Sequence, residues 1–364
     1  MTHAPVPEPL PYHRLARLST RYRWWRPLVG TLVVVVLYVI GVLVLDVVTS
    51  AVGTSRGYPE DADGAVEFGP VPGTAVDLLM LAAAIPVVLL AVRWIGRRPA
   101  GTISSVAGRV RWRWLVRCVL MAVPIVVLTT GAMLLLPADG EPEPHWAGWS
   151  VFGPALAMLV VLVPLQAAAE EYVFRGWLTQ TVGAFLRSPW VAFPPQAVLF
   201  AAAHGWGTPW GFADLVVFGA AAGWLTWRTG GREASIGLHT VNNLLAFGLA
   251  AAVVGGLDSD ETAADAAWDV VALDVVGIVL YTAAVAWWLR RRPLDRTAPA
   301  PLPPVPQPAY AVPYGPYPGT PVPQSWAGRQ VPGVPVPPPW AERPAPGPYG
   351  PPGHPGAGGE ADHS

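Results

Sequence analysis

The sequence predicts an all-α polytopic membrane protein with eight transmembrane helices and a disordered Pro-rich C-terminal tail. Of its 364 residues, 52% are hydrophobic and only 13% are charged, and that charged fraction is about half the value of a typical soluble protein. The hydrophobic residues gather in nearly uncharged runs of about 20, the length that crosses a bilayer as a helix. Arginine-rich and acidic connections alternate between the runs.

Eight hydrophobic segments follow one another within residues 27–290, which we predict to be the membrane domain. Their approximate limits are 27–49, 74–95, 115–136, 151–178, 191–205, 211–227, 235–256 and 267–289. The first is too long, and too heavily flanked by arginine, to be a simple cleaved signal peptide. The single cysteine, Cys118, excludes an internal disulfide and a cysteine-based zinc site.

The charged residues between the segments predict the orientation of the chain. There is no lysine, and most of the arginines lie in the N-tail (1–26), in 93–117, at 187, at 228–232 and in 290–296. The alternate connections are acidic, at 60–67, 139–143 and 258–265. Because basic connections stay in the cytoplasm, we predict a multi-pass protein of the cell membrane with both termini cytoplasmic.

The composition changes after the last hydrophobic segment. Residues 291–364 are rich in proline, glycine and tyrosine, so they have little to bury, and we predict a disordered cytoplasmic tail. Its P-x-x-P stretches fit a domain that recognises polyproline II helices. A solvated spacer with no dedicated partner is the favoured alternative, and no feature indicates nucleic acid as a partner.

A few ionisable residues interrupt the hydrophobic segments. The stretch "AAAEEYVFRGWL" carries Glu170, Glu171 and Arg175, and only His204 and His239 among the seven histidines fall inside hydrophobic segments. Ionisable groups in hydrocarbon are costly and mark function by default. Residues four apart share a helix face, so Glu171 can pair with Arg175 while Glu170 projects elsewhere.

These side chains have the chemistry that hydrolysis of an amide needs. Glu170 and His204 are each 17 residues from Arg187, so a helical hairpin that turns there places them at matching depth. A desolvated glutamate can act as a general base, and a histidine can hold the attacking water or a metal. His239 and Asn243, one helical turn apart, can donate to an oxyanion. No serine or cysteine lies beside a histidine in a nucleophile pattern, which favours activated water.

Three short motifs, in this order, resemble the CPBP family of intramembrane proteases. They are "EEYVFRG" at 170–176, "FAAAH" at 200–204 and "HTVNN" at 239–243. This family contains proteins similar to the type II CAAX prenyl protease and to bacteriocin-processing and immunity proteins, also called the ABI family. The resemblance covers residues 150–256, the motif core. It implies an all-helical membrane protease in which Glu171 and Arg175 support the site.

The resemblance also assigns roles to the other motif residues. Carried over position by position, Glu170 would be the general base and His204 its partner in positioning water. His239 and Asn243 would build the oxyanion site. The resemblance implies an endopeptidase in the lipid bilayer. Its substrate would be a membrane-associated or lipidated peptide or protein.

Metal dependence and two other functions are alternatives at this point. Family members are commonly named metalloproteases, and Glu170, His204 and His239 could supply three ligands to a catalytic zinc. The H-E-x-x-H pattern is absent, so we favour metal-free activation by Glu and His. A non-catalytic bacteriocin-immunity or binding protein would keep the fold without cleavage. A proton-coupled transporter fits less well, because the inverted-repeat signal of many transporters is missing.

Overall fold

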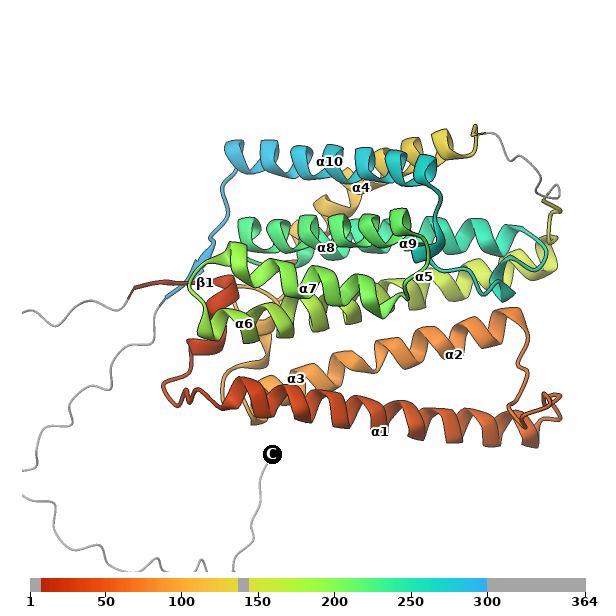
Figure 1. The fold of residues 1–364 in the computed structure, drawn as a ribbon, viewed down its shortest axis with the longest axis horizontal. Helices are drawn as coiled ribbons and strands as arrows, with labels where there is room; N and C mark the ends of the chain where they lie inside the picture. The colour runs from red at the N-terminus through yellow and green to blue at the C-terminus, as the bar shows by residue number, and fades with distance from the viewer. Residues whose placement is uncertain (1–7, 137–143, 300–364) are drawn as a thin grey trace, which may run out of the picture. The chain divides into compact units, whose positions relative to one another are not determined.

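The computed structural model describes residues 8–136 and 144–299, and helices dominate them (Figure 1). The α-helices are α1 (Arg26–Ser55), α2 (Pro70–Ala82), α3 (Ala84–Trp94), α4 (Trp112–Met133), α5 (Trp149–Glu171), α6 (Thr179–Phe185), α7 (Pro189–Ala203), α8 (Pro209–Thr229), α9 (Glu233–Ala252) and α10 (Trp268–Arg291). A π-helix, η3 (Tyr172–Leu178), joins α5 to α6. Short 3₁₀ helices are η1 (Tyr12–Arg17), η2 (Ala100–Ile103), η4 (Gly256–Asp258) and η5 (Ala263–Asp265).

Every predicted hydrophobic segment is helical, but the eight-span layout is confirmed only in part. Among the described residues, five helical stretches have the length and composition to cross a membrane: 26–55, 70–94, 112–133, 149–185 and 268–291. The remaining helices are α7, α8 and α9. With 15 residues, α7 is about 22 Å long at 1.5 Å per residue, less than the roughly 30 Å hydrocarbon core of a bilayer. Five apolar helices therefore support a membrane protein, and eight spans stay a prediction.

Helix α9 is the most enclosed helix of the bundle. All residues from Glu233 to His239 are buried, and α9 packs against α4, α5 and α8. A helix that is buried all round lies inside a bundle rather than on its surface. In contrast, α1 exposes a long row of leucine, valine and isoleucine side chains and lies at the edge of Figure 1. The polar side chains in the first two turns of α9 are therefore surrounded by other helices and not by lipid or solvent.

Helices α7 and α8 approach closely because two glycines of α8 face α7. A Cβ atom added at Gly219 would lie 2.8 Å from Cα of Ala197, and one at Gly223 would lie 2.8 Å from Nε2 of Gln196. Small residues four apart allow helix backbones to pack tightly in membranes. Thr208 caps α8 by accepting a hydrogen bond from the backbone N–H of Gly211 at 2.9 Å. This hairpin fixes the end of α7, where His204 lies.

Short regular elements lie near both ends of the described residues, within the predicted N-tail and C-terminal tail. Strand β1 (Leu10–Pro11) pairs antiparallel with β2 (Thr297–Ala298), and η1 follows β1 directly. Ala298 is 3% exposed and Tyr12 is fully buried, because both belong to one apolar cluster. Residues 297–298 of the predicted C-terminal tail thus form a strand, and residues 10–17 of the predicted N-tail form β1 and η1. Residues 300–364, with their predicted polyproline partner site, lie outside the described residues.

Candidate active site

The acidic motif lies where α5 changes into the π-helix η3. Glu171 is the last residue of α5, and Arg175 follows within η3. Both side chains are fully buried, with Nη1 of Arg175 3.1 Å from Oε1 of Glu171. The Arg175 guanidinium also lies over the ring of Phe200, 4.1 Å from its centroid, an arrangement that stabilises a cation. Such π-segments occur frequently at functional sites, and this one presents the Glu–Arg pair.

His239 lies between the two glutamates. Its Nδ1 is 3.0 Å from Oε1 of Glu171, and its Nε2 is 3.5 Å from Oε2 of Glu170. A carboxylate only accepts hydrogen bonds, so Nδ1 of His239 carries a proton and donates a hydrogen bond to Glu171. This contact fixes the ring orientation and directs Nε2 toward Glu170. The structure thus brings together Glu170, Glu171, Arg175 and His239, as the sequence predicts.

Gln166 joins Glu170 to Asn243 and was not predicted from the sequence. Its Nε2 donates to Oε1 of Glu170 at 2.6 Å, and its Oε1 accepts from Nδ2 of Asn243 at 3.1 Å. Because the carboxylate needs a donor, the amide of Gln166 has one orientation, and Asn243 must then turn its NH₂ group toward Gln166. One N–H of Asn243 is used here, and the other has no acceptor among the described residues. The sequence feature that could have identified Gln166 is its position: it is a polar residue in an apolar run, four residues before Glu170.

The second carboxylate oxygen of Glu170 is free. Oε2 is buried and has no hydrogen-bond partner among the described residues, whereas Oε1 is held by Gln166. The Glu170 side chain is 13% exposed, in contrast to the fully buried Glu171. A buried acceptor without a partner costs free energy, so this oxygen is suited to bind a water molecule. Glu170 therefore has one oxygen held by Gln166 and one oxygen without a partner among the described residues.

His204 lies beside this cluster without bonding to it. The residue caps the C-terminus of α7, and its Nδ1 is 2.9 Å from the carbonyl oxygen of Phe200. A carbonyl only accepts, so Nδ1 carries the proton and Nε2 of a neutral ring keeps its lone pair. The Phe200 ring lies 4.7 Å from the His204 ring and 5.8 Å from the His239 ring. Among the described residues, no hydrogen bond or ion pair joins His204 to Glu170, so their pairing around a water stays a prediction.

The predicted zinc ligands are not grouped for metal binding in this arrangement. Within residues 8–136 and 144–299, no three histidine, cysteine, aspartate or glutamate side chains could hold a metal ion together. Glu170 and His239 are close, and His204 is the separated member. Zinc needs ligand atoms about 2.0–2.2 Å from the ion, and metal dependence stays a prediction.

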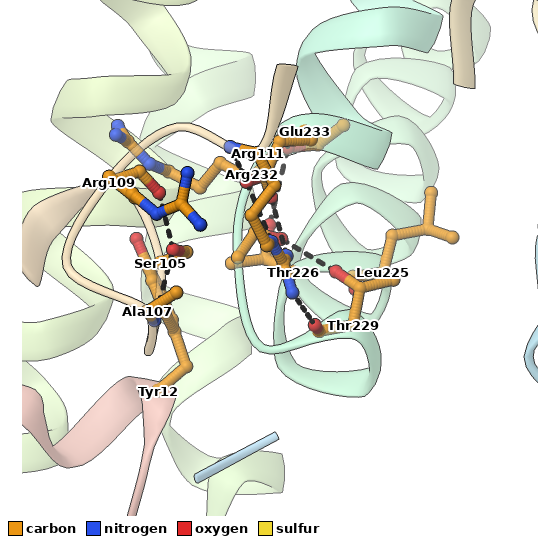
Figure 2. A network of polar contacts seen from close by, with 12 residues as sticks. Tyr12, Ser105, Ala107, Arg109, Arg111, Leu225, Thr226, Thr229, Arg232 and Glu233 are labelled. Carbon is orange, nitrogen blue, oxygen red and sulfur yellow. Dashed lines mark hydrogen bonds and ion pairs between the residues drawn. The ribbon is translucent and has the colours of Figure 1, made fainter. Parts of the chain in front are cut away.

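The N-terminus of α9 is anchored by a buried ion pair (Figure 2). Nε and Nη2 of Arg111 donate to the two carboxylate oxygens of Glu233, at 2.8 and 2.6 Å. Nη1 of Arg111 also donates to the carbonyl oxygen of Thr229 at 2.9 Å. A bidentate pair of this kind fixes direction as well as distance. His239 lies less than two turns along α9, so this anchor helps to set its depth.

A second contact reaches the site from Arg232, beside Glu233. Its guanidinium carbon lies 3.4 Å from the centroid of the Tyr172 ring, and the Tyr172 hydroxyl is 2.8 Å from Oγ of Ser104. Arg232 is 1% exposed. Tyr172 directly follows Glu171, so this contact braces the start of η3 against α9.

Comparison with known proteins agrees with the three motifs. The family model described as Type II CAAX prenyl endopeptidase Rce1-like matches residues 152–245. The uncharacterized protein YyaK of Bacillus subtilis (strain 168) is 28% identical over 285 residues, which are 74% of this chain and 93% of YyaK. No solved structure matches. The family match confirms the resemblance and, at family level, supports a CAAX-protease-like membrane endopeptidase.

Proposed function

We propose that this chain, similar over residues 152–245 to type II CAAX prenyl endopeptidases, is an intramembrane endopeptidase that uses water activated by glutamate and histidine. Its substrate would be a membrane-associated or lipidated peptide. The observation that carries the proposal is the buried, unpartnered Oε2 of Glu170, 3.5 Å from Nε2 of His239. The family match does not identify the general base. The 13% exposure of the Glu170 side chain, against 0% for Glu171, supports Glu170 in this role.

The reaction begins at Glu170. A water bound to Oε2 transfers a proton to this carboxylate while its oxygen attacks the carbonyl carbon of the peptide bond. The lone pair of Nε2 of His204 helps to hold the water. The protonated Glu170 then passes the proton to the leaving amine nitrogen, which breaks the C–N bond and restores the carboxylate.

The developing oxyanion needs hydrogen-bond donors. The N–H of Asn243 that Gln166 does not use can supply one, and His239 can supply a second from Nε2 when its ring is protonated. Glu171 supports this role because it holds Nδ1 of His239. Arg175 in turn compensates the charge of the fully buried Glu171.

The test is cleavage by purified protein in lipid nanodiscs. The probe is a fluorogenic peptide with a prenylated cysteine beside the cleavable bond, with the unlipidated peptide for comparison. Glu170→Gln should lower kcat by about 10²–10⁴-fold, the contribution typical of general base catalysis. Glu67→Gln, the same substitution at an exposed residue of a connection, should cleave like the wild type.

The same variant separates the proposal from its alternative. A non-catalytic immunity or binding protein would protect cells equally well with Glu170→Gln, and no precursor would accumulate. Under the protease proposal, proteomics of the membrane fraction should detect uncut precursors in cells that make Glu170→Gln. Unchanged peptide cleavage by a folded Glu170→Gln protein would contradict the proposal.

A further inference from the structure

A pocket lies where the start of α1, the connection after α3 and helix α6 meet, outside the candidate active site. Its enclosed part measures about 20 Å³, room for about one water-sized group, and the rest of the pocket is open to the surroundings. The polar and aromatic side chains in its lining are Tyr22, Arg26, Arg98, Trp177, Gln180 and Thr181. Two of the six are cationic and none is acidic, so the pocket offers positive charge and hydrogen-bond donors.

Arg98 brings a buried positive charge to this pocket. The residue is 5% exposed, and its Nη1 and Nη2 donate to Oγ1 of Thr102 and Oε1 of Gln180, both at 2.6 Å. Both partners are neutral, and no carboxylate of the described residues forms an ion pair with Arg98. Burial lowers the pKa of Arg98 to about 10, so the guanidinium is still protonated at neutral pH. A buried cation of this kind is stabilised by an anion.

Arg26 and Tyr22 add unused donors. Nη1 of Arg26 and the hydroxyl of Tyr22 are buried and have no hydrogen-bond partner among the described residues. Arg26 is also the first residue of α1, a helix of 30 residues whose N-terminus has no side-chain cap. The positive end of the helix dipole at such a terminus favours anions. Four independent features thus point to one anion.

The neighbourhood of the pocket indicates a lipid. Trp24 and Trp25 are 65% and 42% exposed, and tryptophan concentrates at the level of lipid headgroups. Beyond them, α1 exposes apolar side chains along its length, including Leu28, Leu32 and Val36. The arginines of the pocket, the tryptophans and the apolar face of α1 follow one another as the phosphates, the interface and the acyl chains do in a bilayer. Arginine also binds phosphate through several donors.

We propose that this pocket binds the phosphate group of an anionic phospholipid, with Arg26 and Arg98 as its main ligands. The acyl chains would lie along the exposed face of α1. Trp177 forms part of the wall, donates from Nε1 to Oγ1 of Thr31 at 3.0 Å and packs against Gly30. The bound lipid would thus fasten α1, which makes few other contacts, to the π-helix.

Native mass spectrometry of the full chain in detergent tests the proposal. Phosphatidylglycerol and phosphatidylcholine are added at equal concentration to the wild type and to Arg26→Gln. We expect the wild type to retain phosphatidylglycerol in preference, and Arg26→Gln to bind it at least 10-fold more weakly. Arg23→Gln, which removes the same charge from an exposed residue three positions away, should bind like the wild type.

Two further arms complete the test. Arg98→Gln should reduce phosphatidylglycerol binding as Arg26→Gln does, and circular dichroism shows whether this buried variant has folded. Inorganic phosphate at millimolar concentration should compete weakly, because it lacks acyl chains. Full displacement of the lipid by inorganic phosphate would overturn the lipid as the ligand. Equal losses in Arg23→Gln and Arg26→Gln would overturn the pocket, because general surface charge would then explain the binding.

Discussion

Glu170 and Glu171 are neighbours in the sequence but have different partners. Glu171 is fully buried between Arg175 and His239, whereas Glu170 contacts Gln166 and is 13% exposed. Successive residues of a helix point about 100° apart, so one motif can supply both a fixed charge and a reactive carboxylate. Under the proposed function, Glu171 would support the site and Glu170 would carry out the chemistry.

Gln166 is predicted to be a positioning residue for Glu170 and Asn243. Gln166→Leu removes the donor to Oε1 of Glu170 and should lower kcat by about 10–100-fold with little change in KM, because orientation rather than substrate binding is lost. In Gln166→Glu, a protonated carboxyl can replace the lost donor. The kcat of this variant should therefore rise as pH falls, measured with the lipidated peptide from pH 5 to 8.

A purely structural role for Gln166 would give another pattern. Both variants would then lose activity in proportion to their thermal stability, and the pH profile of Gln166→Glu would match that of the wild type. Phe185→Leu, at a half-exposed residue of α6 outside the site, is a control for small changes in packing.

The sequence alone was sufficient to select candidate site residues that have unusual chemistry for a membrane helix. It was not sufficient to select Gln166. Charged or titratable groups in apolar segments are rare enough to stand out, as Glu171 and His239 did. A glutamine in a helix is common, and its partner Asn243 lies 77 residues away. That contact depends on the packing of α5 against α9, which hydropathy does not determine.

At the scale of elements, hydropathy located the helices but not their interruptions. The predicted segment 74–95 is divided into α2 and α3 at Ala83. Pro86 explains the break, because a proline lacks the N–H that would bond to the residue four before it, here Ala82, and its ring clashes with that carbonyl. The π-helix η3 has no comparable single-residue cause in the sequence, so it could not be predicted.

The close contact between α7 and α8 gives a prediction for Gly219. Gly219→Ala would place a Cβ 2.8 Å from Cα of Ala197, and backbone cannot move aside as a side chain can. Such overpacking should lower the free energy of unfolding by about 1–3 kcal/mol, measured by thermal unfolding in detergent. Peptide cleavage should also fall, because the displaced hairpin carries His204.

Gly131→Ala in α4 is the matched control. A Cβ at Gly131 has no heavy atom within 4 Å, and alanine is the better helix former, so this variant should unfold at the wild-type temperature or above it. If Gly219→Ala is as stable as Gly131→Ala, the helices are less closely packed than described.

At the scale of the whole molecule, the 3₁₀ helix η1 is fastened to the ends of several helices. Nε of Arg17 donates to the carbonyl oxygen of Ala184 at 2.6 Å, and the Tyr12 hydroxyl donates to that of Ile103 at 2.6 Å. His13 is 1% exposed and lies 2.9 Å from the carbonyl oxygen of Arg187. The sequence predicted only an arginine-rich tail here, because charge concealed the short apolar pattern.

Docking of η1 should weaken in acid because of His13. Burial, with a smaller effect from Arg14, lowers the pKa of His13 below its ordinary value, which is about 6.5. The undocked form then binds the proton more tightly, so the stability that His13 contributes is complete above about pH 6.5 and is lost as pH falls below it. Hydrogen exchange of residues 10–17 should be faster at pH 5.5 than at pH 7.5, after correction for intrinsic rates.

His13→Gln keeps a polar side chain without a titration in this range, so its corrected exchange should be equal at the two pH values. Equal protection of the wild type at pH 5.5 and 7.5 would count against a role for His13. The same acceleration in both proteins would assign the effect to other groups.

The pairing of β1 with β2 also has a consequence for biosynthesis. The ribosome makes Leu10 near the start of translation and Ala298 only after all ten α-helices, so the first strand must wait for almost the whole polypeptide. Contacts this distant in sequence form late. The small ladder therefore closes only after α10 has been made, and a nascent protein that stalls before α10 would leave its first strand unpaired and open to quality control.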